Sequence, residues 1–177
     1  MDKKTMSKLS YGLYIIGTRD GEKNVGCVVT TVSQATSDPV TVTLCVNKDN
    51  FTNTCIKKTG SFSVSILAQN FPINTLRIFG FSSSRDKDKF SNAQFDLTAS
   101  GMPYLKEGVL GYMQCKVVES VENHTHTIFI AEVEEAEILS GGEDAEPPLT
   151  YAYYQDVYKG KSPKTASTYH EPEANNK

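Results

Sequence analysis

Short runs of apolar and β-branched residues alternate with turn residues along most of the chain. Residues 13–18, 25–32 and 40–46 are rich in Val, Ile and Thr, which predicts three strands. Residues 19–24 join the first two runs, and their Asp-Gly step favours a hairpin. The first part of the chain is therefore expected to form a sheet.

Two further patterns extend this sheet. In residues 61–67 apolar residues alternate with serines, which predicts a half-buried strand with one polar face. Residues 111–121 and 127–139 are apolar-rich runs on either side of a polar turn at 122–126. This spacing predicts a second, longer hairpin.

Two helices interrupt the strands. Asn50 is suited to cap a helix over residues 51–58, and Gly60 is suited to end it. Asn70 is suited to cap a second helix that runs toward Phe79. Because strands and helices do not alternate, a doubly wound parallel sheet is disfavoured. The order predicts an antiparallel barrel with helices covering its ends.

Composition indicates one domain. The chain has 177 residues, of which 38% are hydrophobic and 22% are charged. We expect a folded domain over residues 1–160 and an extended, partly disordered tail over 161–177, where aliphatic residues almost vanish. The net charge of −3 disfavours nucleic-acid binding. Without an apolar run long enough for a spanning helix or signal peptide, we expect a cytoplasmic protein with no membrane contact.

Motifs for metals and for conventional nucleotide loops are missing from the sequence. The four cysteines form no CxxC pair, so we expect buried thiols rather than a metal site. His124 and His126 lie two apart and share one side of a strand, but no further ligands accompany them. Neither a GxGxxG nor a GxxxxGK[ST] pattern occurs.

Two polar clusters are candidate ligand sites. Residues 30–39 offer hydroxyls, a carboxamide and backbone N–H groups, which suit a phosphate or the edge of a heterocycle. Residues 47–53 open the first predicted helix, whose positive end favours anions. Each cluster also has a plain interpretation: a Thr-rich strand end with its turn, and simple capping by Asn50.

Two other segments allow the same choice between a structural and a functional interpretation. Residues 84–90 supply cations for a phosphate, although mixed-charge runs are usually solvated loops. Tyr151, Tyr153 and Tyr154 lie close together, and tyrosines in a strand are mostly core or interface residues. The functional interpretation is that one of the three tyrosine rings packs against a planar ligand.

Taken together, four segments resemble one known family. They are residues 24–39, the NKxNxT run at 47–52, the Asp-Lys-Phe triplet at 88–90 and the HTIFIAE run at 126–132. In this order they resemble the flavin reductase-like, FMN-binding split-barrel family, over nearly all of residues 10–169. Within the family the chain looks most similar to flavoredoxins and to the flavin reductase part of high-molecular-weight rubredoxins, the latter especially in the closing segment.

The resemblance implies a mainly β fold, an FMN-binding split β-barrel with short covering helices. It also implies a homodimer with FMN near the subunit interface, and electron transfer from NADH or NADPH through FMN to an acceptor such as rubredoxin, another redox protein, free flavin or iron. Because the CxxC pairs of high-molecular-weight rubredoxin are absent, electrons are expected to leave by a separate partner or by free flavin, or else the chain is a fragment. Two alternatives stay open: an electron carrier without its own nicotinamide turnover, and a non-catalytic flavin-binding barrel.

Site residues follow from the same resemblance. The ring of the flavin is expected to contact Asn24 and the bend formed by Thr30, Thr31, Ser33, Gln34 and Ala35. The phosphate is expected near Asn47, Asn50 and Thr52, with Lys89 as its cation. His126 is expected close to the flavin as the catalytic candidate, in an orienting role rather than as a proton donor. Tyr151 is expected as an aromatic neighbour of the cofactor. The chain has no Trp, unlike some relatives, so ring packing near residues 24–34 is expected to differ.

Overall fold

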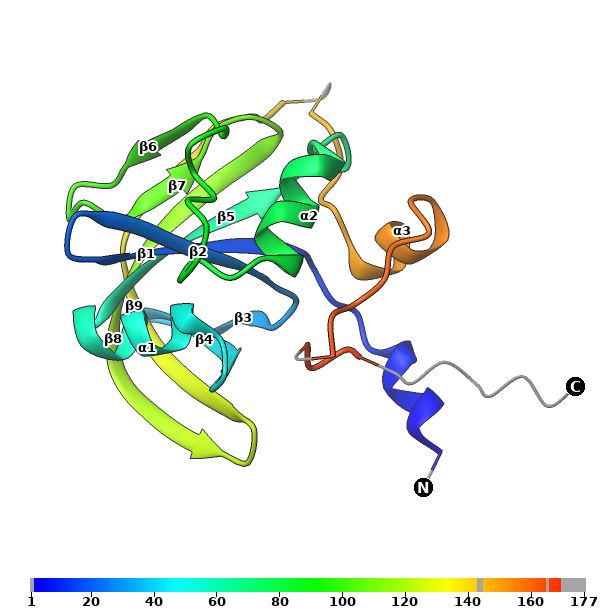
Figure 1. The fold of residues 1–177 in the computed structure, drawn as a ribbon, viewed down its shortest axis with the longest axis horizontal. Helices are drawn as coiled ribbons and strands as arrows, with labels where there is room; N and C mark the ends of the chain where they lie inside the picture. The colour runs from blue at the N-terminus through cyan, green and yellow to red at the C-terminus, as the bar shows by residue number, and fades with distance from the viewer. Residues whose placement is uncertain (1, 143–144, 165, 170–177) are drawn as a thin grey trace, which may run out of the picture.

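Seven antiparallel strands form one curled sheet in the computed structural model, which describes residues 2–142, 145–164 and 166–169 (Figure 1). The strand order is β2-β1-β5-β8-β9-β4-β3. The strands of this sheet are β1 (Tyr14–Asp20), β2 (Lys23–Val29), β3 (Val32–Ser37), β4 (Val40–Asn47), β5 (Ser61–Leu67), β8 (Val109–Asn123) and β9 (His126–Ile138). A separate pair contains β6 (Phe95–Leu97) and β7 (Pro103–Leu105).

The sheet curls far enough for its two halves to share one core. Ile16 and Phe62 come from the β1–β5 half, and Leu44 and Phe129 come from the β4–β9 half. All four side chains are buried in the same apolar cluster. The two end strands, β2 and β3, are not hydrogen-bonded neighbours, so the barrel is split. The predicted mainly β split barrel is thus confirmed.

Strand β5 departs from its predicted half-buried character. Ser63 and Ser65 are as deeply buried as Phe62 and Val64, because β7 crosses the face that they occupy. Ser63 Oγ donates to the Pro103 carbonyl at 2.5 Å, and Ser65 Oγ accepts from the Leu105 N–H at 3.0 Å. The serine side of β5 therefore faces β7 and hydrogen-bonds to it instead of facing solvent. The prediction of one exposed face was therefore wrong.

The polar run after Thr31 is a strand rather than a loop. Strand β3 pairs with β4, with a register shift between Gln34 and Thr36. From Ser33 onward its residues are exposed, so no apolar face was available to mark the strand in the sequence. The predicted strand over residues 25–32 is likewise divided, since β2 ends at Val29.

Three α-helices and one short 3-10 helix, η1 (Lys3–Lys8), complete the described fold. Helix α1 (Phe51–Thr59) begins after Asn50 and ends at Gly60, whose φ of 68° is left-handed, as predicted. Helix α2 (Ile73–Phe81) begins after Pro72 without a side-chain cap, so the predicted cap by Asn70 was wrong.

Helix α3 (Tyr151–Asp156) was not predicted. The close-set tyrosines had been assigned to a strand, but Thr150 Oγ1 accepts from the Tyr153 N–H at 3.2 Å and caps a short helix there. A second apolar cluster packs α2 and α3 against the outside of the barrel, with Leu67, Phe79 and Leu149 at its centre. Within the described residues, no helix combines the length and apolar character needed to cross a membrane.

One charged side chain lies inside this second region. Lys89 is only 4% exposed. Its Nζ donates to the carbonyl oxygens of Gly26 at 2.8 Å and Phe79 at 2.9 Å, which ties the loop after α2 to β2. Among the described residues no carboxylate pairs with it. Burial therefore lowers the pKa of Lys89 to about 8.

This buried amine makes stability depend on pH. In the unfolded chain the amine keeps its ordinary pKa of 10.5, so between pH 8 and 10.5 the unfolded state binds more protons than the native state. The free energy of unfolding of the wild type, relative to Lys89→Met, should rise across this window by at most about 3 kcal/mol. Chemical denaturation of both proteins from pH 7 to 10.5 measures it. A constant difference across the window would contradict a buried, proton-losing Lys89.

Candidate functional site

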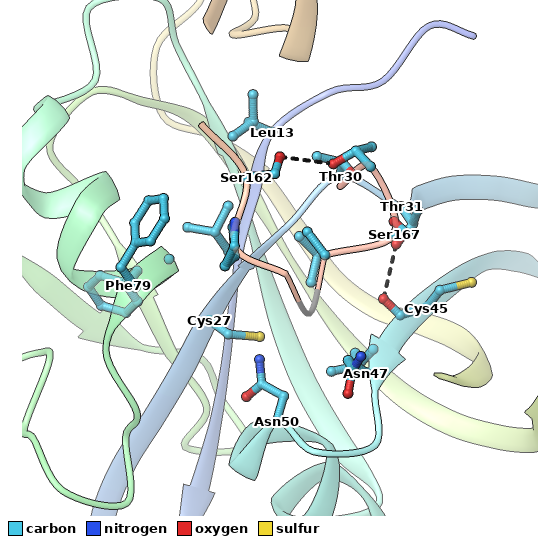
Figure 2. Close-up of a pocket in the computed structure, with 18 of the residues that line it drawn as sticks. Leu13, Cys27, Thr30, Thr31, Cys45, Asn47, Asn50, Phe79, Ser162 and Ser167 are labelled. Carbon is cyan, nitrogen blue, oxygen red and sulfur yellow. Dashed lines mark hydrogen bonds between the residues drawn. The ribbon is translucent and has the colours of Figure 1, made fainter. Parts of the chain in front are cut away.

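A pocket of about 290 Å³ lies where the open seam of the barrel meets α1, α2 and α3 (Figure 2). Its walls come from the ends of β2 and β4, the start of α1, the end of α2, α3 and a C-terminal segment. The lining includes Leu13, Cys27, Val29, Thr30, Thr31, Cys45, Asn47, Asn50, Phe51, Phe79, Ser82, Ser83, His126, Tyr151, Tyr154, Lys161, Ser162, Pro163, Ala166, Ser167 and Thr168.

The bend between β2 and β3 forms one polar wall. Thr31 Oγ1 donates to the Cys45 carbonyl at 3.0 Å, and the Cys45 N–H donates back to the Thr31 carbonyl at 3.2 Å. This exchange fixes the bend against β4, so Thr30 and Thr31 are held at the cavity. The two threonines lie where the sequence predicted a ligand contact.

The start of α1 forms a second polar wall. Asn50 Oδ1 accepts from the Thr52 N–H at 3.0 Å, which caps the helix, and both Asn50 and Phe51 line the cavity. Asn47 also lines it, and its Oδ1 accepts from the Asp49 N–H at 2.8 Å. The positive end of the α1 dipole is therefore directed at the pocket. Thr52, which is expected near the phosphate, is fully buried and does not line the pocket.

His126 stands opposite Asn47 in the pairing of β4 with β9. Its Nδ1 lies 2.9 Å from Thr125 Oγ1, which fixes the ring at the edge of the pocket. Partial burial lowers the pKa of His126 below its ordinary value, so the ring is neutral at pH 7. A neutral, fixed imidazole suits hydrogen bonding and orientation better than proton donation.

Cys27 lines the pocket beside Asn50, and Figure 2 shows the two side chains pointing toward one another. Burial raises the pKa of the Cys27 thiol, so it is neutral at pH 7. The sequence predicted a buried thiol here but no place at the site. Cys55 and Cys115 are also buried and Cys45 is partly exposed; all four are free.

The C-terminal segment, residues 161–164 and 166–169, is called the strap below. It forms turns and crosses the pocket in Figure 2, where Ser162 and Ser167 are labelled. The sequence predicted an extended, partly disordered tail over 161–177, and residues 165 and 170–177 lie outside the described residues. The described part packs on the site instead, with Thr168 only 5% exposed.

Several residues with predicted ligand contacts do not line this pocket. Ser33, Gln34 and Ala35 are exposed on β3, because pairing with β4 carries the chain away from the cavity. Asn24 lies at the other end of β2, with its Oδ1 buried and unpaired within the described part of the chain. Lys89 turns its Nζ to two backbone carbonyls, so it does not line the pocket as a phosphate cation.

Sequence reasoning also missed parts of the wall. The end of α2, with Phe79, Ser82 and Ser83, and the strap come from segments that showed only helix and tail patterns. Their place at the site follows from tertiary packing, which no local pattern encodes. A run of closely spaced serines and threonines in the strap was the one available signal.

The chain matches known proteins over nearly its whole length. The model of the flavin reductase like domain covers residues 6–162. The high molecular weight rubredoxin of Moorella thermoacetica is 41% identical over 169 residues, which is 96% of this chain and 72% of that protein. The ferric-chelate reductase (NAD(P)H) of Archaeoglobus fulgidus is 37% identical over 171 residues, 97% of this chain and 99% of that protein.

A solved structure agrees with the fold. Flavoredoxin from Methanosarcina acetivorans superposes with a TM-score of 0.67 at 22% identity, covering 73% of this chain and 69% of that one. Together with the domain match over most of the chain, the sequence identities are decisive. This protein belongs to the flavin reductase like domain family.

Proposed function

We propose that this chain is an NAD(P)H-dependent flavin oxidoreductase that binds FMN in the pocket and passes electrons on to an acceptor. One observation carries the proposal: the capped start of α1 and the hydroxyl-bearing bend at Thr30 and Thr31 face the same cavity. The family match and the name of the Archaeoglobus fulgidus relative, a ferric-chelate reductase (NAD(P)H), support the reaction type.

The residues present fit a phosphorylated flavin. The start of α1 directs a positive dipole end at the pocket, which suits a phosphate, with Asn50 and Asn47 beside it. Leu13, Val29 and Phe79 give apolar surface for a planar ring. The walls therefore offer FMN both an end that favours anions and apolar surface for its ring.

The protein's part in the reaction is to bind and orient. When bound, FMN supplies the hydride and single-electron chemistry. Thr30 offers its hydroxyl group to the polar edge of the ring, and such groups stabilise negative charge in a partly closed site. Thr31, whose hydroxyl already donates to the Cys45 carbonyl, holds the bend in place. His126, held by Thr125 and neutral at pH 7, orients the ring or the nicotinamide. Tyr151 contributes a pocket wall.

We infer that the acceptor is a redox protein, ferric iron or free flavin. The relatives are named for a rubredoxin and for ferric-chelate reduction, which supports a redox protein such as rubredoxin, or ferric iron, in addition to free flavin. The free thiols fit a reducing compartment, which supports a cytoplasmic location.

Anaerobic reduction tests the enzyme reading. Purified protein loaded with FMN should lose its yellow colour on addition of NADH or NADPH, and stopped-flow absorbance near the flavin band measures this. Bleaching by dithionite alone would contradict the enzyme and leave a carrier or a flavin-binding barrel. Failure to bind FMN at all, judged by fluorescence quenching, would contradict the site itself.

The phosphate position predicts a charge effect at Asn50. Asn50→Asp keeps a good helix cap but places a carboxylate beside the proposed phosphate. The affinity for FMN should fall about tenfold or more, since a like charge at contact distance costs over 1 kcal/mol even when partly hydrated. The affinity for riboflavin, which lacks the phosphate, should change little. Isothermal titration of both ligands measures the difference.

Asn50→Ser is the matched control because serine also caps α1 without adding charge. It should bind FMN nearly as the wild type does. Equal losses for FMN and riboflavin in Asn50→Asp would place the phosphate elsewhere.

We propose that two copies of the chain associate, as the family resemblance implies. Val118 and Val121 on β8 are 58% and 45% exposed, which leaves apolar surface on this strand for a second copy to cover. Sedimentation velocity at micromolar concentration should give twice the chain mass of 19.5 kDa. A single species of 19.5 kDa would contradict the dimer.

A further inference from the structure

The strap is a wall of the pocket without regular secondary structure. Six of its residues line the cavity: Lys161, Ser162, Pro163, Ala166, Ser167 and Thr168. Three of them carry hydroxyl groups, so the strap presents polar groups to whatever fills the pocket. Figure 2 shows it crossing the cavity above Cys27 and Asn50. The rest of the wall comes from strands, helices and the short connections between them.

Tyr151 holds both ends of the strap. Its hydroxyl oxygen lies 2.6 Å from Ser162 Oγ, and the hydroxyl also reaches the Thr168 carbonyl at 3.4 Å. Ser162 Oγ in turn lies 3.3 Å from Thr168 Oγ1. One side chain therefore draws together two positions six residues apart.

Tyr151 itself is firmly placed. Its N–H donates to the Tyr11 carbonyl at 2.9 Å, and its ring packs edge-on against Tyr11 with centroids 6.3 Å apart. Gln155 Nε2 donates to the Tyr151 hydroxyl at 3.1 Å. Tyr151 is therefore held in place by contacts outside the strap, whereas the position of the strap depends on Tyr151.

The strap is attached by few groups. Besides Tyr151, Tyr154 Oη donates to the Lys161 carbonyl at 3.2 Å. Two backbone hydrogen bonds close turns within the strap, from Ala166 to Pro163 and from Tyr169 to Ala166. Segments held by a few hydrogen bonds open far more readily than the core unfolds. Opening the strap would expose one side of the pocket while the barrel stays intact.

We propose that the strap retains the flavin in the pocket, and that Tyr151 is the positioning residue that holds the strap closed. Flavin leaves when the strap opens, so the Tyr151–Ser162 contact sets the residence time of the cofactor. This inference rests on the proposed function and deepens it. The flavin is a held prosthetic group rather than a substrate that exchanges in every turnover.

Flavin release tests the role of Tyr151. Tyr151→Phe keeps the ring but removes the hydroxyl, and Ser162→Ala removes the partner from the other side. Both should raise the FMN dissociation rate about threefold to tenfold, as expected for losing one hydrogen bond. Stopped-flow fluorescence after trapping released FMN with excess apo-flavodoxin measures the rate.

Tyr153→Phe is the matched control, because Tyr153 lies on the same helix and packs against Tyr158 instead of the strap. Its FMN dissociation rate should stay at the wild-type value. Unchanged rates in Tyr151→Phe and Ser162→Ala would overturn the proposal. An equal rise in all three variants would also overturn it, since the effect would then be a general loosening of α3.

Limited proteolysis gives a second readout that needs no turnover. Lys161 and Lys164 are exposed in the strap and are trypsin sites. Cleavage after Lys161, followed by mass spectrometry, should be slowed by FMN in the wild type and accelerated in Tyr151→Phe. A cleavage rate that changes neither with FMN nor with the Tyr151→Phe substitution would contradict a strap that closes over the cofactor.

The two proposals fail in different ways. Wild-type protein that binds no FMN defeats the proposed function and the strap's role with it. Wild-type protein that binds FMN, and releases it at the same rate with or without the Tyr151 hydroxyl, defeats the strap alone.

Discussion

The anchoring of α1 at the seam of the barrel is the constraint on which the site depends. Asn53 is buried, and its Nδ2 donates to the Val46 carbonyl at 2.9 Å, which ties the first turn of α1 to the end of β4. Thr127 Oγ1 donates to Asn53 Oδ1 at 3.4 Å from the neighbouring strand β9. Because both amide atoms of Asn53 are engaged inside the protein, the helix start is fixed while Asn50 remains at the cavity. The positive end of the helix thus faces a site that the barrel holds in place.

The other walls of the pocket differ in rigidity. The bend at Thr30 and Thr31 is bound to β4 by paired hydrogen bonds, so it is as rigid as the sheet. The strap is held by tyrosine hydroxyls on α3, so it is the part that can yield. A rigid helix end that favours anions, combined with one wall that can open, would allow a charged cofactor both to enter the pocket and to stay bound. Lys89 lies behind β2 and supports the wall by tying Gly26 to Phe79.

The sequence allowed the barrel, α1 and its cap to be predicted because their signals are local. The alternation of apolar and polar residues, the Asp-Gly turn, and the caps of α1 at Asn50 and Gly60 are each recognised within a few residues. It did not reveal β3, whose exposed edge has no apolar face, or α3, whose tyrosines suit a strand equally well. Thr30, Thr31, Asn47, Asn50, His126 and Tyr151 were predicted and do line the pocket. Cys27 and the strap were missed because only tertiary packing brings them there, and Lys89 was misplaced because its charge suggested solvent or ligand rather than two buried carbonyls.

The proposed function depends on the first turn of α1 as the binding site for the phosphate of FMN. Amide chemical shifts of Phe51 and Thr52, followed by heteronuclear NMR during titration, test this placement. Both amides should move on addition of FMN and move far less with riboflavin, while Thr30 and Thr31 respond to either ligand. If the amides of α1 stay in place with FMN, or move equally with riboflavin, the helix end is not the phosphate site.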